Sequence, residues 1–101
     1  MPIDPNRILN LAVQVLPLVD DPYPVVDRAI AAIAASGLRY EVGPMETVIE
    51  GKLDDLLAVG KAAHLACFEA GASRVVTILK LGDALEGTTI EAKVAKYRGR
   101  S

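Results

Sequence analysis

The single histidine and the single cysteine, His64 and Cys67, are the most reactive side chains in this chain of 101 residues. Their spacing of three places them on neighbouring positions of a helix, as a thiolate–imidazole pair would require. However, a cysteine within an apolar helix usually packs as a small hydrophobe, and a lone histidine there is usually packed or hydrogen-bonded. Since no third partner accompanies the pair, the sequence does not predict an enzyme.

Metal and nucleic-acid sites are also not expected. One histidine, one cysteine and scattered acids leave no set of ligands for a metal, and the adjacent Asp20 and Asp21 are typical of a solvated loop. The net charge is −2, from 11 Lys and Arg against 13 Asp and Glu. A phosphate backbone would require a basic excess, so nucleic acid is not an expected partner.

Two amides, Asn10 and Gln14, interrupt an otherwise apolar segment near the start of the chain. Period-two alternation over residues 7–16 predicts a strand, in which both amides lie on the same face. A buried amide without a partner costs free energy. These residues therefore either line a polar pocket on the sheet face or pair across a subunit interface.

Length and composition indicate one domain spanning residues 1–101. The chain is 51% hydrophobic with a mean hydropathy of +0.31, which excludes a disordered protein. No apolar run is long enough to span a membrane, and the start of the chain does not resemble a signal peptide, so a cytoplasmic location is expected. This apolar content is high for a small monomer, so we expect association with further copies of the chain.

The pattern of elements predicts an α+β, ferredoxin-like sandwich with the order βαββαβ. Strands are expected at residues 7–16, 38–42, 46–50 and 73–81, helices at 24–36 and 54–70, and a short C-terminal helix at about 90–97. The branched residues on both faces of the last strand predict burial on both sides.

Right-handed crossovers would place both long helices on one face of a four-stranded antiparallel sheet. The other face would have no cover from this chain, and its expected occupants include Ala12, Val76 and Ile78. A bare apolar face is an association surface, so we expect sheets to stack into a homodimer and dimers to pair again.

The segment from Tyr40 to Gly51, YEVGPMETVIEG, resembles the signature of the small thiamine-binding proteins, a family once grouped as a domain of unknown function. The resemblance extends over about residues 7–97, including VLPL at 15–18 and TIEAKV at 89–94. It implies ferredoxin-like subunits that form dimers and tetramers through their sheets. It also implies binding of thiamine (vitamin B1) or its hydroxymethylpyrimidine part without a reaction and without a cofactor.

The resemblance also implies a set of ligand-binding residues. Glu50 would accept hydrogen bonds from an aminopyrimidine or balance the thiazolium charge, although before a glycine it is equally typical of a solvated acid. Thr47 would offer a hydroxyl, although it also suits a strand as a β-branched residue. Gln14 and Asn10 would add polar contacts, and the walls would be the apolar side chains of Pro17, Met45 and Ile49.

Two positions depart from the family pattern. Glu46 stands where the family usually has glycine, and the loop at residues 19–24 carries acids and prolines in place of Gly and Ser or Thr. Both changes lie beside the expected pocket. They favour the alternative that the chain is a ligand-free structural or regulatory module that acts as an oligomer.

Overall fold

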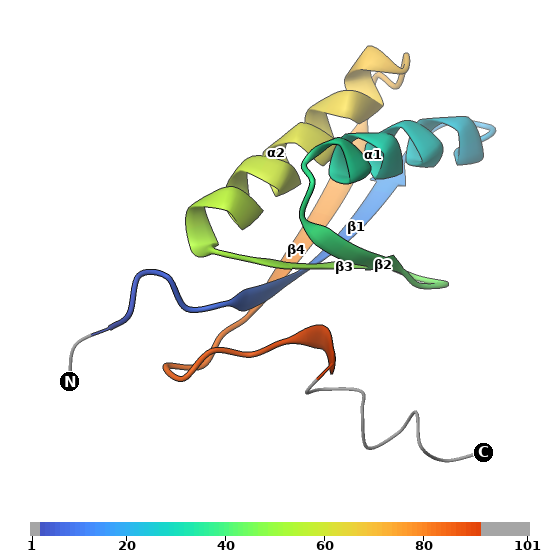
Figure 1. The fold of residues 1–101 in the computed structure, drawn as a ribbon. Helices are drawn as coiled ribbons and strands as arrows, with labels where there is room; N and C mark the ends of the chain where they lie inside the picture. Colours follow the sequence, from blue (N-terminus) through green and yellow to red (C-terminus); the bar gives the residue numbers. More distant parts are fainter. Residues whose placement is uncertain (1–2, 92–101) are drawn as a thin grey trace, which may run out of the picture.

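The helices and strands follow one another in the predicted order in the computed structural model, which describes residues 3–91 (Figure 1). Their observed ends lie within two residues of the predicted ends. The elements are β1 (Leu9–Pro17), α1 (Tyr23–Ala35), β2 (Arg39–Val42), β3 (Thr47–Gly51), α2 (Leu53–Glu69) and β4 (Val75–Gly82). The short helix predicted at about 90–97 lies almost entirely outside the described residues.

The four strands form one antiparallel sheet in the order β2-β3-β1-β4. The central strand β1 pairs with β3 on one side, where Leu11 lies opposite Ile49, and with β4 on the other, where Leu11 lies opposite Leu81. This order and the two crossover helices confirm the predicted ferredoxin-like sandwich.

Both helices lie on the same face of the sheet, as Figure 1 shows, and the hydrophobic core fills the space between. Because side chains alternate along a strand, β1 points every second residue at the helices. The core residues are Leu9, Leu11 and Val13 of β1, Ile49 of β3, Val25, Ala29 and Ile33 of α1, and Leu56, Val59, Ala63 and Cys67 of α2, with Ala72 after it. Each large apolar side chain buried there contributes about 1.5–3 kcal/mol to folding.

The expectation that β4 is buried on both sides is wrong. β4 is an edge strand, so nothing in residues 3–91 pairs with its outer side. Val76 and Ile78 remain 47% and 41% exposed, and Leu79 and Leu81 on the opposite face are similarly exposed. Branched residues on both faces of this strand therefore mark an exposed apolar edge rather than a central strand.

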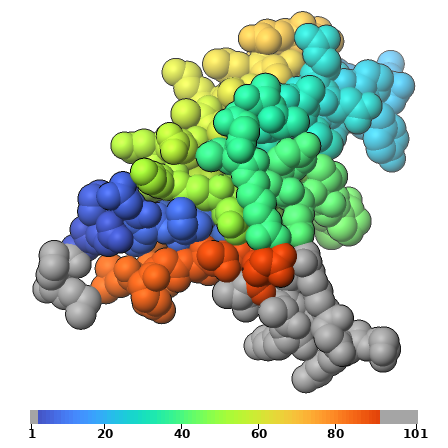
Figure 2. Space-filling model, viewed as in Figure 1, coloured from blue at the N-terminus to red at the C-terminus, as the bar shows by residue number. Residues whose placement is uncertain are grey.

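The expectation that the second face of the sheet has no cover from this chain is also wrong. Residues 83–91, called the strap below, turn back after β4 and lie against that face, beneath the sheet in Figures 1 and 2. Gly87, with a φ of 87°, makes the turn, and the Thr88 N–H then donates to the Ile8 carbonyl at 2.8 Å. Burial of Ile90, which is 3% exposed, stabilises this return.

Within residues 3–91, neither helix combines the length and the apolar character that a membrane span requires.

Candidate functional site

A small cleft, called the hairpin cleft below, lies between α1, β1 and the turn that joins β2 to β3. Its volume is about 110 Å³. The walls are mostly apolar and come from residues 13–15 of β1, from Val26, Ala29, Ile30 and Ile33 of α1, and from residues 42–47. The polar side chains among these lining residues are Gln14, Glu46 and Thr47.

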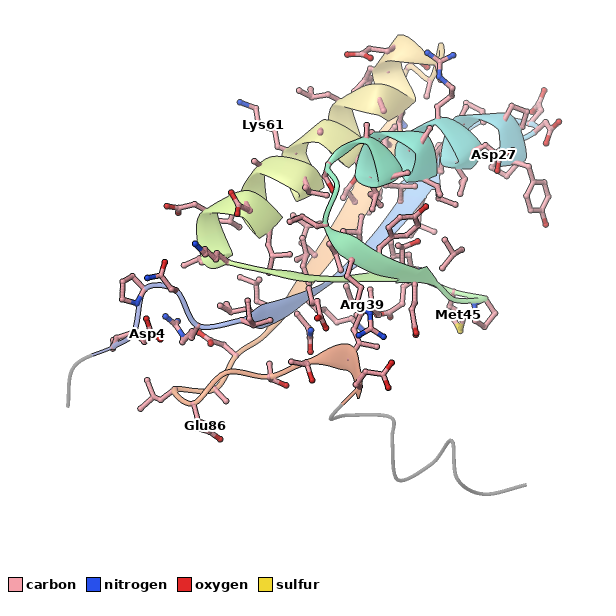
Figure 3. All side chains as sticks on the ribbon, in the orientation of Figure 1. Asp4, Asp27, Arg39, Met45, Lys61 and Glu86 are labelled. Atoms are coloured by element: carbon pink, nitrogen blue, oxygen red, sulfur yellow. The ribbon has the colours of Figure 1, made fainter. Side chains whose placement is uncertain are left out.

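The turn of the hairpin is held tightly at Gly43. Its N–H donates to the Glu46 carbonyl at 2.9 Å, and a Cβ at Gly43 would lie only 2.9 Å from that same oxygen. Glycine is therefore needed for this close approach. The turn places Met45 at the tip of the hairpin, where it is 76% exposed beside the mouth of the cleft (Figure 3).

Thr47 lies inside the hairpin cleft. It is opposite Val13 in the β1–β3 register, so its side chain lies on the helix-covered face of the sheet, and it is only 5% exposed. It therefore offers one hydroxyl, able to donate and accept, among apolar neighbours.

Glu46 forms an ion pair with Lys80 of β4, with 2.9 Å between Oε1 and Nζ. Lys80 lies opposite Ala12, and the ion pair crosses β1 on the face away from the helices. Glu46 borders the hairpin cleft and also a second cavity described below. Sequence reasoning did not include Glu46 or Lys80 among the site residues, although Glu46 stood out as a departure from the family pattern.

Three of the predicted site residues lie on the face of the sheet away from the helices. Glu50 lies opposite Asn10 and is three residues from Thr47, an odd spacing that puts Glu50 and Thr47 on opposite faces of β3. Gln14 has the same orientation as Asn10, although it also borders the hairpin cleft. Pro17, at the end of β1 opposite Val75, is buried and borders neither cavity.

The carboxylate of Glu50 already has a structural partner. It accepts a hydrogen bond from the Ile90 N–H at 2.8 Å and so holds the strap against the sheet. The structure therefore brings together Thr47 and Met45 of the predicted site at the hairpin cleft. Gln14 borders this cleft from β1, but its side chain lies on the opposite face of the sheet, and Glu50 and Asn10 are in a different environment.

That second environment contains a cavity of about 360 Å³, called the open-face cavity below. Its lining residues are Asn10 and Ala12 of β1, Glu41, Glu46 and Val48 from β2, β3 and the turn between them, Lys80, Leu81 and Gly82 of β4, and Ile90 of the strap. Asn10 is 4% exposed, and its amide donates to the Leu9 carbonyl at 3.3 Å. Its Oδ1 atom accepts no hydrogen bond from residues 3–91.

His64 and Cys67 make separate contacts. The Nδ1 atom of His64 shares a hydrogen bond with the Thr77 hydroxyl at 2.6 Å, as expected for a packed histidine. The Cys67 thiol is fully buried and donates to the Ala63 carbonyl at 3.5 Å, and burial raises its pKa, which disfavours the thiolate. Within residues 3–91, no three His, Cys, Asp or Glu side chains gather closely enough to hold a metal ion.

Ion pairs attach the strap at both ends. Arg7 donates from Nε to Asp83 at 2.8 Å, and this contact lowers the pKa of the Asp83 carboxyl while it raises the pKa of Arg7. At the other end Arg39 of β2 pairs with Glu91, and this hydrogen bond raises the pKa of Arg39. Figure 3 shows the Arg39 side chain extending from β2 toward the strap.

Comparison with known proteins matches this chain to a described family. The profile of the thiamine-binding protein family matches residues 11–98. This range includes the whole lining of the hairpin cleft and, except for Asn10, the lining of the open-face cavity and every predicted site residue. The chain belongs to the thiamine-binding protein family.

Relatives and solved structures of this family resemble the chain over nearly its whole length. A UPF0045 protein of Clostridium perfringens is 47% identical over 91 residues, which cover 88% of this chain and 96% of that protein. A structure of the domain of unknown function DUF77 from Bacillus cereus has a TM-score of 0.87 at 46% identity and covers 92% of each chain.

A second structure, from Thermotoga maritima, carries a name that proposes a role in thiamine biosynthesis or salvage. It has a TM-score of 0.82 at 36% identity, and the match covers 90% of this chain and 99% of that one. The family resemblance expected from residues 40–51 is therefore confirmed, and it points to a thiamine-related binding role.

Proposed function

We propose that this protein is a cytoplasmic, non-catalytic binder of thiamine or of its hydroxymethylpyrimidine part, and that it acts as a homo-oligomer. The observation that carries the proposal is the hairpin cleft, where Thr47 and Met45 meet inside the part of the chain that matches the thiamine-binding family. The separate contacts of His64 and Cys67 support binding without a reaction.

The size and lining of the hairpin cleft favour a single aromatic ring. Sites for drug-sized ligands occupy roughly 300–1,000 Å³, whereas this cleft has about 110 Å³. Apolar walls from β1 and α1 suit the two faces of an aminopyrimidine, and the Thr47 hydroxyl can exchange hydrogen bonds with its ring nitrogens or amino group. The remaining part of thiamine would then extend past the mouth of the cleft.

Glu46, rather than Glu50, is the carboxylate beside this mouth. Glu46 is a lining residue of the hairpin cleft, and its side chain is 29% exposed. Its carboxylate pairs with Lys80 across β1, so it would exchange this partner to balance the positive thiazolium outside the cleft. Glu50 lies on the other face of the sheet and holds the Ile90 N–H. We therefore assign the charge-balancing role to Glu46.

The test is isothermal titration calorimetry with thiamine and with hydroxymethylpyrimidine. We expect T47V, which removes the hydroxyl and keeps the shape, to weaken binding by about tenfold. T77V is the matched control, because it removes a strand hydroxyl that contacts His64 and does not border the hairpin cleft. No heat with either ligand at millimolar concentration and folded protein would overturn the function, and equal affinities of T47V and T77V would overturn the site.

The exposed edge strand supports the homo-oligomer. Antiparallel pairing of β4 with a second copy would satisfy its free backbone groups and cover Leu79 and Leu81, while stacking of the second faces would cover Val76 and Ile78. Dimers that use one of these contacts could pair again through the other.

Analytical ultracentrifugation checks this assembly. We expect I78K to reduce the oligomer to a smaller species, because the lysine would introduce a charge into the covered face. L57K changes a similarly exposed leucine on α2 and serves as the control. An oligomer of wild-type size for I78K would contradict the sheet-mediated interface.

One observation favours a second candidate function, a ligand-free oligomeric module with a structural or regulatory role. Lys80 already neutralises Glu46, the carboxylate beside the cleft. If this alternative holds, titrations with thiamine and with hydroxymethylpyrimidine give no heat of binding, while the oligomer forms as described.

A further inference from the structure

The closed end of the hairpin cleft is lined by apolar side chains. Among the lining residues, Val13, Ala29 and Ile33 are 4%, 1% and 1% exposed, and all three belong to the hydrophobic core. Thr47, at 5%, is the one polar lining residue that is buried to a similar extent. The opposite end opens beside the exposed Met45. The cleft therefore runs from a solvent-exposed mouth to an apolar floor that offers a single hydroxyl.

Ala29 leaves the space at this floor open. The other residues of α1 that line the cleft are valine and isoleucine, so Ala29 has the smallest side chain among them. A cavity of about 150 Å³ with aliphatic walls can hold benzene, so the volume of about 110 Å³ here allows at most one six-membered ring. A larger side chain at position 29 would occupy part of that volume.

The structure of the ligand determines which of its atoms reaches the floor. In thiamine the bridge to the thiazolium leaves the pyrimidine ring at C5, and hydroxymethylpyrimidine carries its hydroxymethyl group on the same carbon. This carbon must point to the mouth, because the cleft has no room for a second ring. The atom across the six-membered ring is C2, which carries a methyl group in both compounds. This methyl group therefore points to Val13, Ala29 and Ile33.

The hydroxyl of Thr47 cannot by itself distinguish this ring from cytosine. It can accept a hydrogen bond from the amino group on C4 and donate one to the ring nitrogen N3. Cytosine presents the same amino group beside the same ring nitrogen. The two rings differ at C2, where cytosine carries a carbonyl oxygen in place of the methyl group. Selection between them must therefore come from the floor of the cleft.

An apolar floor favours a methyl group over a carbonyl oxygen. Burial of the methyl group is favourable because it removes apolar surface from water. A carbonyl oxygen would lose its water and face Val13, Ala29 and Ile33, whose side chains carry no hydrogen-bond donor. Thr47 can donate to that oxygen only if it releases N3, since a hydroxyl has one hydrogen. The floor therefore penalises cytosine by its chemistry rather than by its size.

We propose that Ala29, together with Val13 and Ile33, forms a methyl-recognition pocket that makes this protein selective for 2-methyl-4-aminopyrimidines over cytosine-type rings. Ala29 is the specificity-determining residue, because its small side chain leaves room for the methyl group. The inference rests on the proposed function, since it concerns the ligand of the same cleft. The pocket lies on the helix-covered face of the sheet, so stacking of the second faces in an oligomer does not cover it.

Isothermal titration calorimetry of the full-length wild type tests this selectivity. Three ligands share the amino and hydroxymethyl groups and differ at C2: hydroxymethylpyrimidine, its analogue with hydrogen in place of the methyl group, and 5-hydroxymethylcytosine. We expect loss of the methyl group to weaken binding about fourfold, which is the contribution of one buried methyl group. The carbonyl oxygen should weaken binding by roughly tenfold or more, because it is buried without a donor.

A pair of matched variants tests the role of Ala29. A29V fills the pocket and should weaken hydroxymethylpyrimidine by about tenfold, whereas the analogue without the methyl group should lose less than about threefold. A31V is the control, because it makes the same substitution at an exposed position of α1 that does not border the cleft. Both ligands should bind A31V as they bind wild type. Thermal melts establish that both variants are folded.

Two results would overturn the methyl-recognition pocket and leave the proposed function standing. They are equal affinities of wild type for the three ligands, and equal losses of both pyrimidines in folded A29V. If A29V does not fold, the order of the three affinities in wild type decides. No heat of binding with hydroxymethylpyrimidine or thiamine would instead overturn the proposed function, and the pocket with it.

Discussion

The two faces of the sheet are built from alternate residues of the same strands, yet they differ in almost every physical respect. On the helix-covered face, Leu11 and Ile49 are completely buried in the hydrophobic core, and Thr47 adds one buried hydroxyl. On the other face, the Oδ1 atom of Asn10 has no donor among the described residues, and ion pairs and a short strap provide partial cover. The helix-covered face supplies most of the stability of the fold and holds the hairpin cleft at its edge, while the other face carries charged and amide side chains.

The largest difference between the two faces is expected for substitutions at the centre of the core. L11A should lower the free energy of unfolding by about 2–5 kcal/mol, because it deletes buried methyl groups where two strands and α2 meet. Urea denaturation measures the loss, which should not depend on protein concentration.

V76A is the matched change on the second face. Its cost should be within about 0.5 kcal/mol in the monomer and should grow with protein concentration if that face is an interface. A concentration-independent loss for V76A as large as that of L11A would remove the distinction between the two faces.

A smaller effect is expected where the strap is attached. E50A removes the acceptor of the Ile90 N–H, so the exchange of this amide hydrogen should accelerate by about tenfold. E50Q keeps an acceptor oxygen and should retain most of the protection. If E50A leaves exchange at Ile90 unchanged, other contacts hold the strap.

The smallest effect concerns the Arg7–Asp83 pair at the start of the strap. Arg7 lowers the pKa of Asp83 below its usual 3.8, so the pair stabilises the folded state above that pH. The contribution is lost as the pH falls through the lowered pKa. Thermal melts of D83N should therefore show a lower melting temperature than wild type at pH 6, and the difference should shrink in strong acid.

A difference between wild type and D83N that persists below the lowered pKa would show that the carboxylate charge is not responsible. The melting temperatures measured in strong acid therefore decide whether the charge of Asp83 stabilises the fold.

The fold was predictable because its signals are local. Alternating residues such as Leu9 to Val15 define β1, the three–four spacing through Ala29 and Ile33 defines α1, and glycines follow the helices. The strap was missed because its position depends on a contact between Ile90 and Glu50, which lie forty residues apart in the chain. No local pattern encodes such a contact.

The candidate site was predictable only in part. Thr47 and Met45 do meet at the hairpin cleft, whereas the side chains of Thr47 and Glu50 cannot share one pocket. Their spacing of three on a strand already contains that information, because an odd spacing changes the face. The Glu46–Lys80 pair needed the register of three strands before it could be seen.

The two edges of the sheet also differ, and the difference limits how assemblies can grow. β4 offers eight residues rich in exposed aliphatic side chains, whereas β2 has four residues and places Arg39 and Glu41 on the second face. Pairing of two β4 edges about a twofold axis would leave short, charged strands at both ends of the joined sheet. Such an assembly closes on itself, so a chain with this much exposed apolar surface can form a finite particle instead of an open-ended fibre.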